Sequence, residues 1–183
     1  MDLRRMAAGL RRTYQQAELH TLGVRNGLGC RGEFTIEVLD ARGRVREARH
    51  VANLVVNAGL DWLKDYAFNP STTQTQMGYI GVGSDNTTEA ATDTALGSQV
   101  ARQAVSAYTA GGTGVLTVET TFAAGVATGA LTEAALFDAS SGGDMWNRAT
   151  FATVNVGAGD AIKVTITITF TASDALALAL TVT

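Results

Sequence analysis

The sequence contains one cysteine and one proline in 183 residues, and it is also poor in charged side chains. The single cysteine, Cys30, excludes an internal disulfide framework and a zinc site built from several thiolates. Charged residues make up 17% of the chain, below the roughly 25% of an average globular protein. We interpret this shortfall as an indication that the chain buries part of its surface against partner proteins.

Long hydrophobic runs are missing as well. No stretch reaches the roughly 18 uncharged apolar residues that a membrane-spanning helix needs, so we expect no membrane partner. Residues 1–16 contain arginines but no apolar run of the length found in a secretion signal. These absences predict synthesis in the cytoplasm.

The charges that are present are unevenly distributed. Residues 1–49 hold ten basic and six acidic side chains, a net charge of +4, whereas residues 50–183 hold four basic and eleven acidic side chains, a net charge of −7. All ten basic residues of the first segment are arginines, which form bidentate pairs with carboxylates as readily as with phosphates. We predict a basic N-terminal anchoring arm over residues 1–32 that docks on a partner through Arg4, Arg5, Arg11, Arg12, Arg25 and Arg31.

Two kinds of partner suit such an arm. Arginine clusters bind nucleic acid, but no interleaved aromatic residues, zinc-finger spacing or helix-turn-helix pattern accompanies them here. We therefore favour an acidic protein surface over nucleic acid. Within the arm, apolar residues at helical spacing between positions 2 and 20 predict a short amphipathic helix, and several glycines then predict an extended link.

From residue 33 onward the sequence alternates as β-strands do. In residues 162–170, isoleucine, valine and phenylalanine alternate with lysine and threonine, which is typical of a half-buried strand. Many such segments follow one another, separated by turns rich in Gly, Ser and Asp. We predict a mainly β body over residues 33–183, an antiparallel β-sandwich of the Ig-like or jelly-roll-like kind. The threonines of residues 163–171 favour either a solvated face or stacking between subunits.

One segment of the body changes period. Asn57 precedes apolar residues at spacings of three, which predicts one short internal helix with Asn57 as its N-cap. Leu60, Leu63 and Tyr66 are expected to face inward.

Residue patterns that carry catalysis are not evident. His20 and His50 have no metal-ligand spacing, and no G-x-S-x-G nucleophile motif occurs. The segment 81–85, Gly-Val-Gly-Ser-Asp, lacks the third glycine of a dinucleotide-binding turn and the lysine of a P-loop. We predict no catalytic residue, no metal site and no cofactor. An incidental cation on the acids Asp85, Glu89 and Asp93 stays open as an alternative, although they do not match the EF-hand pattern.

Three segments of the body occur in a characteristic order. They are Asn53-Leu54-Val55-Val56-Asn57-Ala58-Gly59-Leu60; Ile80-Gly81-Val82-Gly83-Ser84 with Thr94-Ala95-Leu96 and Arg102 downstream; and Leu131-Thr132-Glu133-Ala134-Ala135-Leu136-Phe137 followed by Met145-Trp146-Asn147-Arg148-Ala149. In this order they resemble virion proteins of tailed bacteriophages, of the tail-fibre, collar or minor tail type, over roughly residues 33–170. The resemblance implies a small β-sandwich that forms trimers or rings on the particle, with no catalytic residues.

The resemblance also implies buried packing and ion-pair positions at Glu133 and at residues 146–148. Arg102 and Arg148 are two of only four basic residues in the acidic segment 50–183, so we expect them to pair with Glu133, Asp138 or Glu119.

These observations predict a non-enzymatic virion structural protein that self-assembles as a homo-oligomer and docks on other virion proteins at the tail, neck, collar or capsid surface through its arm. The main alternative is a receptor- or carbohydrate-binding fibre module. An enzyme such as a cell-wall hydrolase is a third reading, but the sequence offers no carboxylate pair or nucleophile to place in a pocket.

Overall fold

The computed structural model describes residues 27–173, and the chain divides into two compact units. One unit comprises residues 1–29 and 170–183, of which only residues 27–29 and 170–173, the ends of two strands, are described. The other unit, residues 30–169, is the body considered below. The predicted N-terminal helix lies outside the described residues.

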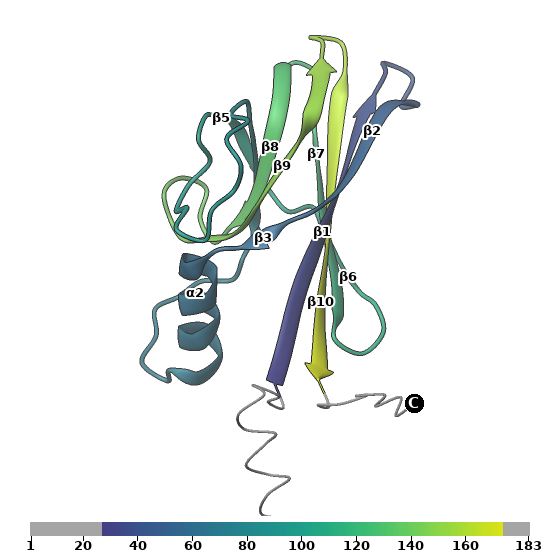
Figure 1. Cartoon of the computed structure of the whole chain (residues 1–183). Helices are drawn as coiled ribbons and strands as arrows, with labels where there is room; N and C mark the ends of the chain where they lie inside the picture. Colours follow the sequence, from purple (N-terminus) through teal and green to yellow (C-terminus); the bar gives the residue numbers. More distant parts are fainter. Residues whose placement is uncertain (1–26, 174–183) are drawn as a thin grey trace, which may run out of the picture. The chain divides into compact units, whose positions relative to one another are not determined.

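Ten strands and one helix make up the described part of the chain (Figure 1). In chain order they are β1 (Gly27–Leu39), β2 (Val45–Ala52), β3 (Leu54–Val55), α2 (Asn57–Phe68), β4 (Tyr79–Gly83), β5 (Gln99–Ala104), β6 (Ala107–Ala110), β7 (Val115–Phe122), β8 (Gly129–Phe137), β9 (Met145–Val156) and β10 (Ala161–Ser173). Sheet A has the strand order β2-β1-β10-β7-β6, and sheet B has the order β3-β9-β8-β4-β5. The predicted antiparallel β-sandwich with one short helix is confirmed.

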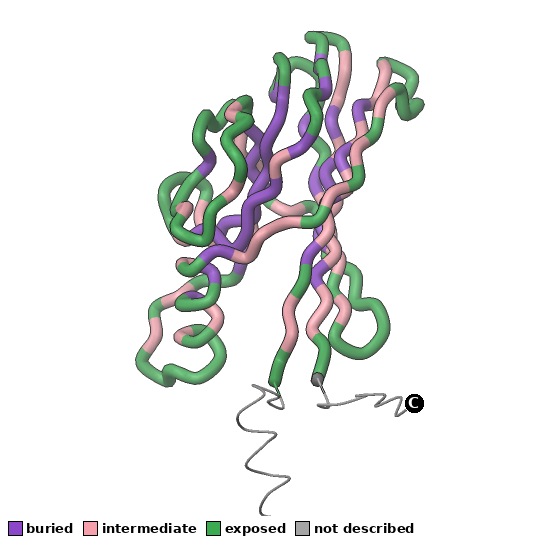
Figure 2. Tube along the Cα trace, in the orientation of Figure 1, coloured by how far each residue is buried: buried purple, intermediate pink, exposed green. Residues whose placement is uncertain are grey.

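Strand alternation gives sheet A one buried face, and Figure 2 shows buried segments in the strands of both sheets. Phe34, Ile36 and Val38 on β1 are fully buried, and Ile162 and Ile166 repeat the pattern on β10. Each such side chain stabilises the fold by about 1.5–3 kcal/mol relative to its exposed form. A register slip of one residue would turn this whole set toward water, so the hydrophobic pattern fixes the pairing. No helix within residues 27–173 is long and apolar enough to cross a membrane.

The chain crosses from one sheet to the other at both lateral edges of the sandwich. Asn53 alone separates β2 in sheet A from β3 in sheet B, and residues 105–106 separate β5 in sheet B from β6 in sheet A. Arg49 reinforces the first edge by donating hydrogen bonds to two carbonyls of β9, and Gln103 reinforces the second by donating to the carbonyl of Thr121 at 3.1 Å. The edge strands are therefore short or tied to the opposite sheet, which hinders pairing with strands of other chains.

Strands β1 and β2 form a hairpin that spans residues 33–52. Asp40 closes its turn by accepting hydrogen bonds from the backbone N–H groups of Arg42 and Arg44, at 2.8 and 3.0 Å. Gly43 adopts a φ of 73°, a left-handed conformation that favours glycine. The turn chemistry thus explains why the chain reverses at this point.

Helix α2 begins where the sequence predicted, but its cap differs. The N-cap residue is Val56, which makes no side-chain capping bond, so the assignment of Asn57 as the cap is wrong. The backbone N–H of Asn57 donates instead to the carbonyl of Ala91 at 2.8 Å. A contact with a distant loop therefore takes the place of a local cap at this helix end.

The helix also presents a different face to the body from the one predicted. Gly59 and Trp62 are its buried residues and Leu63 is half-buried, whereas Leu60 is 51% exposed and Tyr66 40% exposed. Trp62 makes an edge-on contact with Trp146 of β9, with ring centroids 5.8 Å apart. The tryptophan pair and the small Gly59 thus orient the helix, in place of the leucine stripe.

Gly59 allows α2 to approach β9 closely, which gives a first prediction. A Cβ atom at position 59 would overlap the backbone carbonyl of Trp146. We expect Gly59→Ala to lower the free energy of unfolding by about 1–3 kcal/mol, the usual cost of overpacking, although alanine favours helices. Urea denaturation measures this, with Gly159→Ala as the matched control because nothing lies within 4 Å of that position. Equal stability of the two variants would contradict the proposed close contact.

Candidate functional site

Sheet B is covered on both of its faces. Seven consecutive residues of β8, from Leu131 to Phe137, are buried, although successive side chains of a strand point to opposite faces. A small apolar cluster accounts for part of the covering; it consists of Val56, Leu96, Ala135, Phe137 and Met145. Leu96 belongs to the segment between β4 and β5, residues 84–98, which we call the covering loop.

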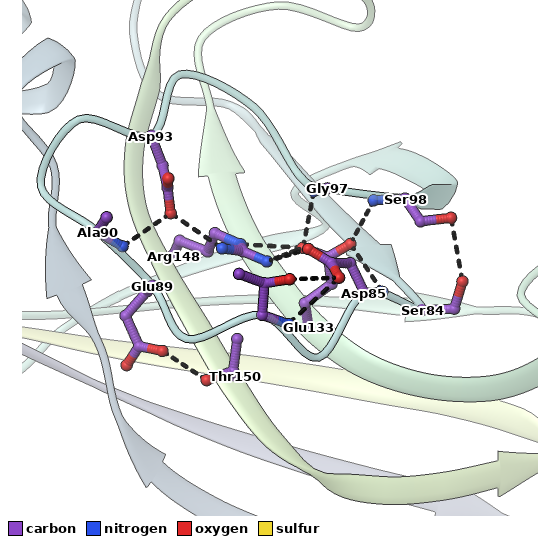
Figure 3. Close-up of polar contacts among 11 residues, drawn as sticks. Ser84, Asp85, Glu89, Ala90, Asp93, Gly97, Ser98, Glu133, Arg148 and Thr150 are labelled. Carbon is purple, nitrogen blue, oxygen red and sulfur yellow. Dashed lines mark hydrogen bonds and ion pairs between the residues drawn. The ribbon is translucent and has the colours of Figure 1, made fainter.

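The covering loop lies over two charged residues of sheet B (Figure 3). Glu133 on β8 is fully buried, and Arg148 on the adjacent β9 is 3% exposed. The Nε atom and one terminal nitrogen of Arg148 each lie 2.9 Å from Oε2 of Glu133. The structure therefore joins two of the three residues that the sequence singled out as ion-pair candidates.

Arg148 also binds two carboxylates of the covering loop. Its terminal nitrogens lie 2.9 Å from Asp93 and 3.0 Å from Asp85. These acids are 55 and 63 residues away in the sequence, so the contact is wholly tertiary. One guanidinium thus connects the sheet to two points of the loop.

Glu133 binds the backbone of the same loop. Its carboxylate accepts N–H hydrogen bonds from Asp85 at 3.2 Å, Gly97 at 3.0 Å and Ser98 at 2.8 Å. These donors lie near the start and the end of the covering loop. A single buried carboxylate therefore fixes both ends of the loop and receives the hydrogen bonds that a buried charge requires.

Two glycines make room for this arrangement. A Cβ atom at Gly83 would overlap the carboxylate of Glu133, and one at Gly97 would overlap the carboxylate of Asp85. The Gly-Val-Gly segment that superficially suggests a phosphate-binding turn therefore ends in a glycine packed against a carboxylate. We assign this glycine to loop packing.

The acids that left a cation site open are bound to groups of the protein. Asp85 accepts hydrogen bonds from the backbone and hydroxyl of Thr87, and Glu89 accepts one from the hydroxyl of Thr150. Asp93 accepts one from the backbone N–H of Ala90 at 2.9 Å, besides its bond to Arg148. Among residues 27–173, no group of three or more His, Cys, Asp or Glu side chains is arranged to hold a metal ion.

The electrostatics of the cluster follow from these contacts. Burial alone would lower the pKa of Arg148, but hydrogen bonds to Asp93 and Glu133 outweigh it and raise the pKa. The backbone and hydroxyl of Thr87, with a further contribution from Arg148, lower the pKa of Asp85. Each group is therefore stabilised in its charged form by its neighbours in the folded protein.

Arg102, the third ion-pair candidate, makes none of the expected pairs. Its guanidinium lies over the ring of Phe137, 3.4 Å from the centroid, and donates hydrogen bonds to the carbonyls of Ala139 and Gly142. Glu119 instead pairs with Lys163 at 2.9 Å. Partial burial lowers the pKa of Arg102, although the nearby Asp138 opposes this shift without a direct ion pair.

Arg31 lies in a different place from the one predicted. It belongs to β1, which begins at Gly27, so residues 27–32 are part of sheet A and not of a separate arm. The other predicted docking residues, Arg4, Arg5, Arg11, Arg12 and Arg25, lie outside the described residues.

Comparisons of the chain with protein-family models, with curated proteins and with solved structures find no match.

The buried pair of Glu133 and Arg148 yields a second prediction. Arg148→Met removes the guanidinium and leaves the carboxylate of Glu133 buried without its cation, which we expect to cost about 3–5 kcal/mol in urea denaturation. Arg44→Met is the matched control, because Arg44 pairs with Asp40 at the surface with its side chain 69% exposed. Such an exposed pair contributes about 0–1 kcal/mol. Similar losses in the two variants would refute a stabilising role specific to the buried cluster.

Acid sensitivity of the covering loop is a third prediction. The folded-state pKa of Asp85 is lowered, so its stabilising contribution is complete above its unfolded pKa and is lost as pH falls through the folded value. We expect the thermal midpoint to hold near neutral pH and to fall below about pH 4. Asp85→Asn should lower the midpoint at pH 7 and make the acid decline shallower. Part of the acid decline should remain in that variant, because Arg44 lowers the pKa of Asp40 and Asp40 is unchanged. An unchanged decline in Asp85→Asn would exclude the proposed contribution.

Proposed function

We propose that this chain is a non-enzymatic structural protein of a tailed-bacteriophage virion, which associates with copies of itself and docks on other virion proteins. The observation that carries the proposal is the bonding of the buried charges. Arg148 donates a hydrogen bond to Glu133 and another to Asp93 of the covering loop, and Glu133 accepts hydrogen bonds from the backbone of the same loop. These bonds hold the loop in place. A cluster that fixes a loop on a sheet suits a rigid scaffold.

The charge distribution supports docking through the N-terminal arginines. Residues 1–26 contain five arginines and two acids, whereas residues 27–173 contain nine basic and fourteen acidic side chains. A segment of net charge +3 and a body of net charge −5 attract each other between copies, and the segment suits any acidic virion surface. We place the protein at the tail, neck, collar or capsid surface of the particle, the range that the resemblance in sequence implies.

The alternative of a receptor- or carbohydrate-binding module has less support. Binding sites gather exposed aromatic side chains, typically on neighbouring loops. In residues 27–173 the most exposed aromatic side chains are Phe68 and Tyr66 at the end of α2 and Tyr108 on β6. Tyr66 is also stacked on Trp62, with ring centroids 4.8 Å apart. A glycan array tests this alternative, and specific glycan binding would favour it over the structural role.

Incorporation into particles provides a fourth prediction. Tagged full-length chain and a variant lacking residues 1–26 are produced in cells that assemble phage particles without the native copy, and the particles are purified by density gradient. We expect the full-length chain in the particles and the truncated chain in the soluble fraction. Because β1 begins at Gly27, the truncation leaves the sheets complete.

Circular dichroism provides the folding control for the truncated chain, which should keep its β spectrum and thermal midpoint. Absence of the full-length chain from the particles would refute a virion role. Normal incorporation of a folded truncated chain would refute docking through the N-terminal arginines.

A further inference from the structure

The two sheets differ in what covers their outer faces. Sheet B is covered by α2, whose Trp62 packs on β9, and by the covering loop. In sheet A, the side opposite to Ile36, Val118 and Ile166 keeps its side chains half-buried or exposed within residues 27–173. We call this side the open face.

Building on the proposed function, we propose that the open face of sheet A is the surface on which a second copy of this chain packs face to face. In this contact the partner is an identical chain, and the two copies of sheet A face each other. Copies would thus associate without using the lateral edges of the sandwich, where the chain crosses between the sheets.

The size of the open face fits a stable protein contact. Five strands about 4.8 Å apart give a width of roughly 24 Å, and the eight residues of β7, at about 3.3 Å each, give a length of roughly 26 Å. The resulting area of roughly 600 Å² approaches the ~800 Å² that each partner buries in a standard interface. Stacking of sheets in this aligned manner is the common packing of β-sandwiches.

The side chains of the open face are mostly threonines, with charged residues among them. Threonines are the most frequent side chains on it, among them Thr35, Thr117, Thr121, Thr165, Thr167 and Thr169. Thr117 and Thr167 are cross-strand partners whose hydroxyl oxygens lie 3.3 Å apart. The threonines present methyl and hydroxyl groups to a partner, and the charged side chains among them restrict how two copies can be oriented.

The charges on the open face indicate the orientation. Lys163 binds Glu119 at 2.9 Å, and the charge of Glu37 adds to the rise in the pKa of Lys163. Arg31 and Glu37 lie on the same side of β1, six residues or roughly 20 Å apart. Neither makes an ion pair with another residue of the described chain. Two copies stacked with antiparallel β1 strands would place Arg31 of each over Glu37 of the other.

This two-fold contact restricts the number of chains in the assembly. An isologous contact pairs copies, so the assembly should contain an even number of chains. The sequence resemblance implies trimers or rings, and of these the contact is compatible with rings of even copy number.

The test uses the full-length chain in analytical ultracentrifugation across a range of concentrations. We expect a reversible dimer, or an even multiple of it, and loss of that species in Thr167→Arg, which places a long charge in the middle of the open face. Thr73→Arg is the matched control, since Thr73 is exposed in the segment after α2. The control should associate as the unchanged chain does.

A charge exchange tests the orientation and does not depend on Thr167→Arg folding. Arg31→Glu and Glu37→Arg each place like charges together, so each should weaken association about tenfold. The double variant restores opposite charges and should return the dissociation constant to within about threefold of the original. A monomeric full-length chain, or a dimer that Thr167→Arg and both single exchanges leave unchanged, would overturn the inference.

The outcomes separate this inference from the proposed function. A monomeric chain that still enters particles would overturn the contact and leave the virion role. A chain that dimerises through the open face but is absent from particles would support the contact and overturn the virion role.

Discussion

The fold depends on satisfying one buried carboxylate. Burying the charge of Glu133 in sheet B costs several kcal/mol unless a cation and hydrogen-bond donors surround it. Arg148 supplies the cation, and the N–H groups of Gly97 and Ser98 are among the donors. The covering loop is therefore required by the sheet, because without it the carboxylate would lack those donors. The same loop places Leu96 in the apolar cluster. Polar and apolar contacts therefore both hold the covering loop on sheet B.

Two arginines of the body show how the depth of burial selects the partner. Arg148 is 3% exposed and is surrounded by carboxylates, whereas Arg102 is only partly buried and binds carbonyl oxygens and the ring of Phe137. A deeply buried guanidinium needs opposite charge close by, while one in contact with water can also be satisfied by neutral acceptors. The sequence predicted an acidic partner for both because the body is acidic, and only the resemblance indicated that Arg148 would be buried.

The sequence predicted the strands better than it predicted the contacts between them. β10 could be predicted because a half-buried strand alternates with a period of two. The buried face of α2 could not, since it is set by the approach of Gly59 to Trp146, which joins segments far apart in the chain. Likewise the pairing of Glu133 with Arg148 was foreseeable from the scarcity of basic residues. The roles of Asp85 and Asp93 depend on where a long loop comes to lie.

The distribution of covered and uncovered surface constrains how such a body can assemble. Strand addition at the edges is hindered, because the chain itself passes between the sheets there and Arg49 binds carbonyls of β9 across one edge. The outer face of sheet B is covered by the covering loop and α2, and contacts within the chain fix the shape of both. Sheet A offers a flat face of short side chains, with charges such as Arg31 and Glu37 toward opposite ends of one strand. On such a surface, the charges set the orientation of a contact and the strands supply its area. Sheet A, whose outer face the described chain leaves uncovered, is therefore the sheet suited to contact a copy of itself.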